Sequence, residues 1–92
     1  MEKYKLFKNE KPDAYGYYWI RTERINGITK EKEMTEWYLV YFGEYNYKRK
    51  IRIMINWINN GQQEFNSLEA SLNASGLKYE MQGPVVPFNY PF

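Results

Sequence analysis

The sequence predicts a mainly β fold: a compact antiparallel sheet, or a small barrel, of about five strands with one short helix. Two observations predict it. Aromatic residues make up 20% of the 92-residue chain, and flat rings pack well on the pleated surface of a sheet. Several segments also alternate apolar and polar residues with the period of two that is typical of strands. A chain of this length forms one domain, residues 1 to 92, around a single core.

Three strands stand out in the first two thirds of the chain. Residues 17 to 21 form the first, after a turn-prone stretch that contains Pro12 and Gly16. Every residue from 37 to 42 is apolar or aromatic, which predicts a strand that is buried on both faces. In residues 50 to 57, three isoleucines and a tryptophan alternate with Lys, Arg, Met and Asn. This alternation predicts a strand with one buried face.

A hairpin is predicted between the first two of these strands. Asn26-Gly27 is the dipeptide that best suits a two-residue type I′ turn, because both central residues of that turn need a positive φ. Such a turn would place Glu23 opposite Lys30 and Trp19 opposite Met34. The outer part of this hairpin carries few large apolar side chains, so we expect it to project from the core as a charged ribbon.

One short helix is predicted at about residues 67 to 75. Asn66, followed three residues later by Glu69, resembles a capping box, in which the two side chains satisfy unpaired N–H groups of the first turn. Gly76 is well placed to end the helix, because Gly adopts the left-handed conformation that closes many helices.

Two further strands and a tail complete the predicted domain. Residues 62 to 65 and 77 to 82 read as strands, and residues 83 to 92 as an extended aromatic tail, because Gly83-Pro84 continues a ladder poorly. Three uses of the tail stay open: covering a sheet edge, presenting the PxxP segment 84–87 to a groove, or assembling a homodimer.

We expect large side chains of the predicted strands, with one leucine from the helix, to form the hydrophobic core. The expected core residues are Trp19, Ile20, Trp37, Leu39, Ile53, Ile55, Trp57 and Leu72.

The residue types that are missing narrow the range of functions. The chain has no His and no Cys, so catalytic triads, thiolate chemistry and most zinc sites lack their usual groups. We therefore expect a protein that is not an enzyme and that uses no metal ion or cofactor.

A net charge of +2 argues against a general polyanion-binding protein. The longest apolar run, residues 37 to 42, is too short to span a bilayer, and the first residues lack a signal-peptide pattern. A cytoplasmic protein without membrane contacts is expected.

Two clusters of cations are the candidate binding residues. A tyrosine-rich bend near residue 48 mixes rings with cations, as grooves for single-stranded nucleic acid do. The same bend could equally be a solvated hairpin tip that discourages edge pairing, or could dock on an acidic protein surface. The predicted ribbon supplies the second cluster. The candidate residues are Tyr45, Tyr47, Lys48, Arg49, Lys50 and Arg52 in the bend, and Arg21, Arg24, Lys30 and Lys32 in the ribbon.

Three motifs carry a resemblance: GYYWIR at 16–21, EWYLV at 36–40, and YEMQGP at 79–84 with Pro87 behind it. This pattern resembles small uncharacterised accessory proteins of phages and prophages, many of which read GYYW-x-R, then a tryptophan-led strand, then GP-x-x-P. The resemblance implies a viral accessory role. Several small phage proteins inhibit bacterial immunity, either by plugging a defence nuclease or by sequestering a nucleotide signal.

From the resemblance and the missing catalytic groups we expect a non-enzymatic, phage-derived inhibitor of a bacterial defence system, such as an anti-CRISPR. It would act by binding a defence protein in the cytoplasm of the bacterial host. Two alternatives stay open. One is a sponge for a nucleotide signal or a binder of single-stranded nucleic acid, and the other is a structural module that associates with itself.

Overall fold

The structure, a computed structural model, describes residues 5–57 and 61–85, with only the backbone of Tyr47. It contains seven strands and one helix: β1 (Lys5–Lys8), β2 (Gly16–Ile25), β3 (Lys32–Met34), β4 (Tyr38–Tyr47), β5 (Lys50–Trp57), β6 (Gly61–Glu64), α1 (Phe65–Ala74) and β7 (Tyr79–Val85).

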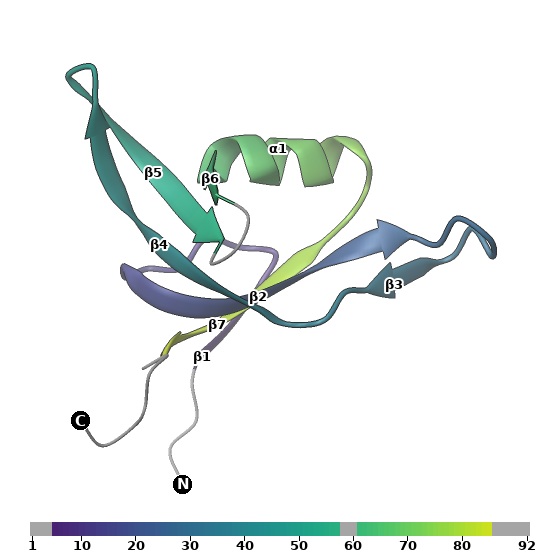
Figure 1. Cartoon of the computed structure of the whole chain (residues 1–92). Helices are drawn as coiled ribbons and strands as arrows, with labels where there is room; N and C mark the ends of the chain where they lie inside the picture. Colours follow the sequence, from purple (N-terminus) through teal and green to yellow (C-terminus); the bar gives the residue numbers. More distant parts are fainter. Residues whose placement is uncertain (1–4, 58–60, 86–92) are drawn as a thin grey trace, which may run out of the picture.

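The strands form one open antiparallel sheet in the order β1-β7-β2-β4-β5-β6, with β3 attached to β2. The prediction of a mainly β fold with one helix is confirmed. The barrel alternative is wrong, because the sheet ends at β1 and β6 and does not close on itself. The strand count is seven rather than about five: β1 was not predicted, and β3 is the second strand of the predicted ribbon. α1 lies across one face of the sheet (Figure 1).

The core lies between α1 and the centre of the sheet. Phe65 at the start of α1 packs edge-on against Phe42 of β4 and Tyr79 of β7, with ring centroids 5.3 and 5.9 Å away. The buried residues of this core come from six elements: Phe7, Tyr18, Ile20, Val40, Phe42, Ile55, Phe65, Leu72, Tyr79 and Met81. Of the eight core residues that we predicted, Ile20, Ile55 and Leu72 are buried, and Ile53 and Trp57 pack against the core.

The orientation of β2 corrects the predicted core. Tyr18 and Ile20 are buried, whereas Trp19 is 36% exposed on the opposite face. Residues 17 to 20 are all aromatic or apolar, so the sequence pattern does not reveal which alternate residues face inward. The neighbouring strands decide it, because Tyr18 lies opposite the buried Val40 and Ile20 opposite the buried Met81.

Only one face of β4 is deeply buried, so the prediction of a strand buried on both faces is wrong. Val40 and Phe42 point into the core, whereas Leu39 is half-buried opposite Trp19, and Tyr38 is 47% exposed. Trp37 precedes the strand and is also only half-buried. α1 covers one face of the sheet, and the large apolar residues on the other face stay in partial contact with water.

The alternation predicted for β5 is confirmed over its inner half. Ile55 is buried, and Ile53 and Trp57 pack against the core. Ile51, however, is 67% exposed. α1 packs against β5 and β6, whereas Ile51 pairs with Asn46 in the outer part of the β4–β5 hairpin.

The register of the β2–β3 ribbon differs from the prediction. Glu23 pairs with Met34, and Arg24 pairs with Glu33. The connection is not a two-residue turn: it spans residues 26 to 31 and is closed by a hydrogen bond from the first N–H to the last carbonyl. This register brings opposite charges together at Arg24 and Glu33, 2.8 Å apart. The predicted register would instead have placed two cations, at positions 21 and 32, opposite each other.

The helix begins two residues earlier than predicted and without a capping box. Its N-cap is Glu64, whose side chain makes no capping hydrogen bond in the described chain. Glu69 does not reach back to the first turn. Its carboxylate accepts a hydrogen bond of 2.5 Å from the hydroxyl of Tyr79, and this bond ties α1 to β7.

The predicted end of the helix at Gly76 is confirmed. Gly76 has a φ of 69° and donates its N–H to the carbonyl of Asn73, while Leu77 donates to the carbonyl of Leu72. This pair of bonds is a Schellman motif. Leu77 then packs against the core beside Leu72, so the chain enters β7 close to the sheet.

β7 lies between β1 and β2. Lys5 pairs with Gly83 on one side, and Ile20 pairs with Met81 on the other. The strand continues to Val85, so residues 83 to 85, which we assigned to the tail, form its end. The predicted behaviour of residues 86 to 92 lies outside the described residues. The short strand predicted at 62–65 is β6, one residue earlier.

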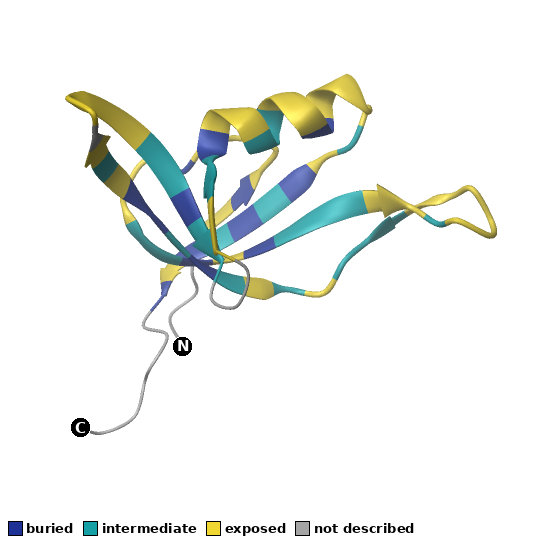
Figure 2. Ribbon diagram, turned by 45° about the horizontal axis from the view of Figure 1, so that its top comes forward, coloured by how far each residue is buried: buried dark blue, intermediate teal, exposed yellow. Residues whose placement is uncertain are grey.

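Two hairpins project from the sheet in different directions. The β4–β5 hairpin and the β2–β3 ribbon extend to either side of α1 (Figure 1), and the molecule is flat, with extents of 44 × 41 × 23 Å. Figure 2 shows that buried residues occupy the centre of the sheet and that both projecting ends are exposed. The predicted binding residues lie in these two hairpins, except Arg21, which pairs with Glu80 of β7 in the body of the sheet.

Candidate functional site

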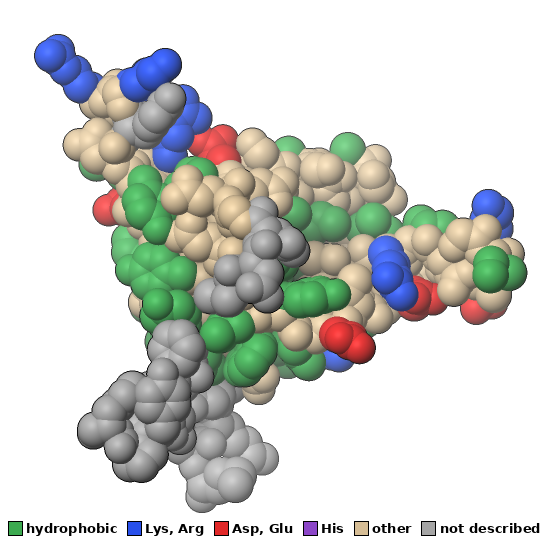
Figure 3. All heavy atoms as spheres, viewed as in Figure 1, with side chains coloured by type: hydrophobic (Ala, Val, Ile, Leu, Met, Phe, Trp, Pro, Cys, Tyr) green, Lys and Arg blue, Asp and Glu red, His purple; other side chains and the backbone are tan. Residues whose placement is uncertain are grey.

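The outer part of the β4–β5 hairpin, residues 45 to 52, forms a projection that we call the basic arm. Its strands pair Tyr45 with Arg52 and Tyr47 with Lys50. Lysine and arginine side chains gather at its end, away from the body of the molecule (Figure 3). The predicted bend is therefore a regular hairpin that carries its charge at the tip.

The tip of the basic arm is a two-residue turn with an unfavourable backbone. Lys48 and Arg49 have φ angles of 52° and 66°. Positive φ at both central residues is the geometry of a type I′ turn, for which Asn-Gly is a preferred pair. In this left-handed conformation an L-residue other than Gly loses roughly 1–2 kcal/mol. The chain thus holds two cations at positions where Asn and Gly would be more stable.

A hollow of about 660 Å³ lies at the base of the basic arm, and we call it the arm hollow. Its volume falls within the range of pockets that hold small ligands. Residues from β4, β5, β6 and the first turn of α1 line it: Tyr45, Asn46, Arg52, Met54, Gln62, Glu64 and Ser67.

Polar contacts fix the walls of the arm hollow. Arg52 Nη1 lies 2.8 Å from Glu64 Oε2, and Ser67 Oγ donates to Glu64 Oε1 over 3.2 Å. The amide of Asn56 donates to the hydroxyl of Tyr45. Glu64 therefore neutralises Arg52, and an anionic ligand in the arm hollow has to compete with this carboxylate.

The cations of the ribbon have partners within the fold. Arg21 donates through Nε and Nη2 to Glu80 Oε1, over 2.8 and 2.7 Å. Its guanidinium also lies over the ring of Trp37, 4.5 Å from the ring centre. These contacts join β2, β7 and the start of β4, so Arg21 has a structural role.

The other ribbon cations follow the same pattern, with one exception. Arg24 pairs with Glu33, and Lys32 Nζ donates to the carbonyl of Gly76 at the end of α1, over 2.8 Å. Lys30 is exposed on the loop at the end of the ribbon and has a φ of 63°.

The structure thus divides the ten predicted binding residues into two groups. The six in the bend are together in the basic arm, and Tyr45 and Arg52 also line the arm hollow. Of the four ribbon cations, three lie on the other hairpin, and Arg21 lies in the body of the sheet beside β7. Lys30, Arg49 and Lys50 make no ion pair with any described residue.

Five residues that line the arm hollow were not predicted. The alternation of β5 gives a signal for Met54, because it lies on the same face as Arg52. The sequence gives no signal for the others, since the pairing of β6 with β5 and the start of α1 cannot be read from it. These residues are Asn46, Met54, Gln62, Glu64 and Ser67.

The pKa shifts of Tyr79 and Glu33 belong to contacts outside the basic arm. Burial raises the pKa of Tyr79, and its hydrogen bond to Glu69 raises it further. The hydrogen bond from Asn26 lowers the pKa of Glu33, and Arg24 adds to this effect. Both shifts favour the charge state that makes a structural contact.

Within residues 5–57 and 61–85, no three acidic side chains gather in a way that could hold a metal ion. No helix in this part of the chain is long and apolar enough to cross a membrane. Comparisons with protein-family models, curated proteins and solved structures found no match.

Proposed function

We propose that this chain is a non-enzymatic binding protein whose basic arm docks on an acidic surface of a partner protein. The observation that carries the proposal is the pair of cations at the left-handed positions of the tip, Lys48 and Arg49. Strained backbone conformations cluster at functional sites. Asn-Gly would form the same turn more easily, so the two cations are held there at a cost in backbone energy.

The arrangement of the aromatic rings favours a protein partner over a nucleic acid. Single-strand binders stack bases on open rings. On the outer face of the sheet, Tyr17 and Tyr41 contact each other edge-on at 5.0 Å, and the guanidinium of Arg21 lies over Trp37. Trp19 and Tyr38 are more exposed, but they lie in the body of the sheet and not beside the cations of the basic arm. The cations without an ion pair in the arm are also few, so the counterion release that drives nucleic acid binding would be small.

The resemblance to phage accessory proteins supplies a biological setting for this proposal. In that setting the partner is a bacterial defence protein, and the chain inhibits it by occupying an acidic surface, as an anti-CRISPR would. A surface that normally receives nucleic acid is basic, so the proposal points to an acidic regulatory or assembly surface.

Charge reversal with a matched control tests the proposal. The tagged double variant Arg49→Glu/Lys50→Glu is compared with the wild type and with Lys8→Glu/Lys11→Glu, which reverses two exposed cations outside the arm. Each is used to capture proteins from nuclease-treated bacterial lysate at low and at physiological ionic strength. We expect the arm variant to retain its partner at least about tenfold less well, because like charges then face each other. Equal retention by the wild type and the arm variant would overturn the proposal.

The arm hollow favours a second candidate function, the binding of a nucleotide signal. Its volume of about 660 Å³ suits a small ligand, and the ring of Tyr45 and the guanidinium of Arg52 could contact a base and a phosphate. This function requires Arg52 to break its ion pair with Glu64 and to form one with the phosphate of the ligand. Small molecules released by heat from the purified protein, and lost in Arg52→Ala, would favour it. The self-association alternative involves residues 86 to 92, which lie outside the described residues.

A further inference from the structure

β5 has a free edge in its outer half. β6 pairs with β5 only from Met54 to Trp57. Residues 50 to 53 have β4 on one side and no strand of the described chain on the other. No backbone hydrogen bond joins this free edge to another described segment, and Figure 1 shows β6 beside the inner end of β5 only. The N–H and C=O groups on this side of the strand can therefore bind the backbone of an added strand.

The side chains along the free edge alternate between cationic and apolar. Lys50 and Arg52 lie on one face of the strand, and Ile51 and Ile53 lie on the other. Ile53 packs against the core, but Ile51 is 67% exposed. Lys50 makes no ion pair with any described residue. A strand added here would meet both an uncovered isoleucine and an unpaired cation.

We infer that the free edge of β5 accepts an extended segment of a partner protein in which acidic and apolar residues alternate. Residues directly opposite each other in paired strands lie on the same face and contact each other. An apolar residue opposite Ile51 covers it, and an acidic residue opposite Lys50 pairs with it. The inference rests on the proposed function, the docking of the basic arm on an acidic partner, and states how the chain of that partner lies.

The arm hollow makes the residue opposite Lys50 more selective than the residue opposite Arg52. Arg52 lines the hollow and lies 2.8 Å from Glu64. An acidic residue opposite Arg52 has to share this guanidinium with a carboxylate of the same charge. Lys50 has no such competitor, so the acidic residue opposite Lys50 contributes most to the choice of partner.

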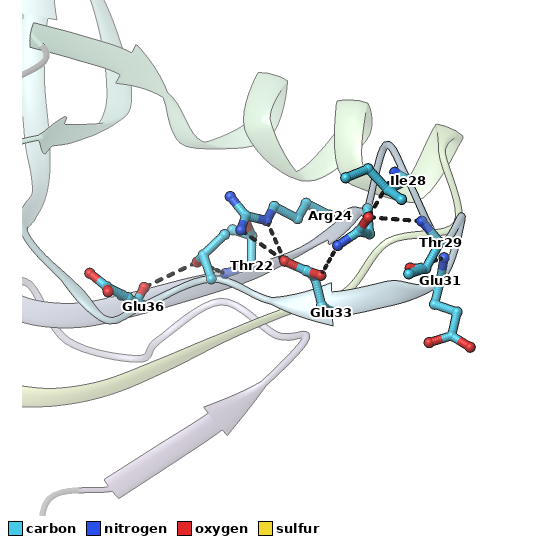
Figure 4. A network of polar contacts seen from close by, with 9 residues as sticks. Thr22, Arg24, Ile28, Thr29, Glu31, Glu33 and Glu36 are labelled. Atoms are coloured by element: carbon cyan, nitrogen blue, oxygen red, sulfur yellow. Dashed lines mark hydrogen bonds and ion pairs between the residues drawn. The ribbon is translucent and has the colours of Figure 1, made fainter.

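The other open edges of the sheet suit an acidic strand less well. On the opposite side of the basic arm, residues 43 to 47 include Glu44 and no cation, so they repel it. On β1, Lys5 is paired with Asp13. In the β2–β3 ribbon, Glu33 accepts hydrogen bonds from both Arg24 and Asn26, so the cation there is neutralised (Figure 4).

A second copy of this chain does not suit the free edge. Pairing two copies of residues 50 to 53 with isoleucines on the same face places cations opposite cations, since Lys50 and Arg52 share the other face. Like charges directly opposite each other destabilise strand pairing. Cations on an edge strand thus discourage self-association and at the same time favour an acidic strand.

The test titrates the isotope-labelled chain with a synthetic hexapeptide of alternating valine and glutamate, followed by NMR. Three control peptides each change one feature. One has lysine in place of glutamate, one has serine in place of valine, and one is N-methylated at every residue, which keeps the side chains but removes the N–H groups. We expect the valine–glutamate peptide to shift the amide signals of residues 50 to 53 and to slow their exchange with solvent. Each control peptide should bind at least about tenfold more weakly.

Variants of the chain test the same contacts from the side of the protein. Ile51→Ser should bind the valine–glutamate peptide roughly tenfold more weakly, because less apolar surface is then buried, whereas Ile51→Val should bind it nearly as well as the wild type. Ile25→Ser is the matched control, since Ile25 is an exposed isoleucine at the end of β2. Lys50→Glu should also weaken binding at least about tenfold. Should Ile51→Ser unfold, the serine peptide tests the same contact with the wild-type chain.

Several results would overturn the inference. No binding of the valine–glutamate peptide at about 1 mM overturns it, while the capture experiment with Arg49→Glu/Lys50→Glu still tests the proposed function separately. Equal binding of the N-methylated peptide excludes strand pairing and leaves a contact between charges alone, as in the proposed function. Equal binding of the lysine peptide excludes an acidic segment. Signals that shift at β1 or at residues 43 to 47, and not at residues 50 to 53, place the peptide on another edge.

Discussion

Replacing Arg49 by Gly at the tip of the basic arm should make the protein more stable and its binding weaker. Arg49 has a φ of 66° and follows Lys48, whose φ is also positive. Gly adopts this conformation without steric conflict. The substitution therefore removes backbone strain and one cation together, and the two effects can be measured separately.

The expected gain in stability follows from two opposing terms. Relief of the left-handed conformation contributes roughly 1–2 kcal/mol. The greater freedom of Gly in the unfolded chain offsets about 0.5–1 kcal/mol of this. The net increase in the free energy of unfolding is about 0.5–1 kcal/mol. For a chain of 92 residues this corresponds to a rise in Tm of roughly 2–8 °C.

Thermal unfolding followed by circular dichroism measures this rise, and Lys50→Gln is the matched control. Lys50 begins β5 and is not among the residues with a positive φ, so this substitution removes a neighbouring cation without touching the turn. Any stabilisation that comes from reduced charge repulsion should appear in both variants. The difference between their Tm values isolates the backbone term.

An Arg49→Gly protein with a Tm equal to or below that of Lys50→Gln would refute the reasoning. It would mean that the turn is not strained, and the presence of cations at its tip would then need no functional explanation. The proposal for the basic arm would lose the observation that carries it, whatever the result of the capture experiment with Arg49→Glu/Lys50→Glu.

Three further predictions concern the folded body and the ribbon. Tyr79→Phe should lower the free energy of unfolding by about 1–2 kcal/mol in urea titrations at neutral pH, because a buried hydrogen bond to a carboxylate is lost. The pKa of Tyr79 is raised in the fold, so above about pH 10 the unfolded chain loses the hydroxyl proton first, and the stability of the wild type should fall. The stability of Tyr79→Phe should fall less over the same pH range. An equal fall in both proteins would contradict the role given to Tyr79. Asn26→Ala should return the lowered pKa of Glu33 toward its ordinary value in an NMR titration, because the hydrogen bond from Asn26 is the main cause of the shift. The contribution of this shift to the stability of the wild type is present above about pH 4.3 and is lost in more acidic solution. Phe65→Ala should destabilise the protein by about 3–5 kcal/mol, more than Trp19→Ala, since Trp19 is partly exposed; the reverse order would show that β2 faces the other way.

Much of the secondary structure could be predicted from local patterns. β5 was predicted because its isoleucines alternate with polar residues, and the end of α1 because Gly76 is suited to a left-handed closing residue. These signals depend only on neighbours in the sequence. Predictions that needed more distant information were less successful.

The failures have specific physical causes. The aromatic run of β2 does not reveal which alternate residues face the core. The pairing of β2 with β4 and β7 places Trp19 on the outer face. Asn26-Gly27 suits a two-residue turn, but Asn26 Oδ1 instead accepts hydrogen bonds from the N–H groups of Ile28 and Thr29 in a longer loop. The register that goes with this loop pairs Arg24 with Glu33. Glu69 fits a capping box, yet a hydroxyl from β7 is its partner.

The candidate site was predicted in composition but not in geometry. The basic residues of the bend are together at the tip, as the sequence suggested, because they are neighbours in a hairpin. The arm hollow could not be foreseen, since Gln62 and Glu64 reach it only through the pairing of β6 with β5. The free edge of β5 likewise depends on where β6 ends, at Glu64.

The position of β7 has a consequence for how the protein is made. β7 lies between β1 and β2, yet it begins at residue 79, more than fifty residues after β2 ends at Ile25. During synthesis, one edge of β2 therefore has no partner until β7 leaves the ribosome, and pairing over such a distance is slow because a long loop must close. In that interval an aromatic strand edge is open to other chains. We expect nascent chains truncated before residue 79 to aggregate or to bind chaperones, and the complete β7 to end this phase.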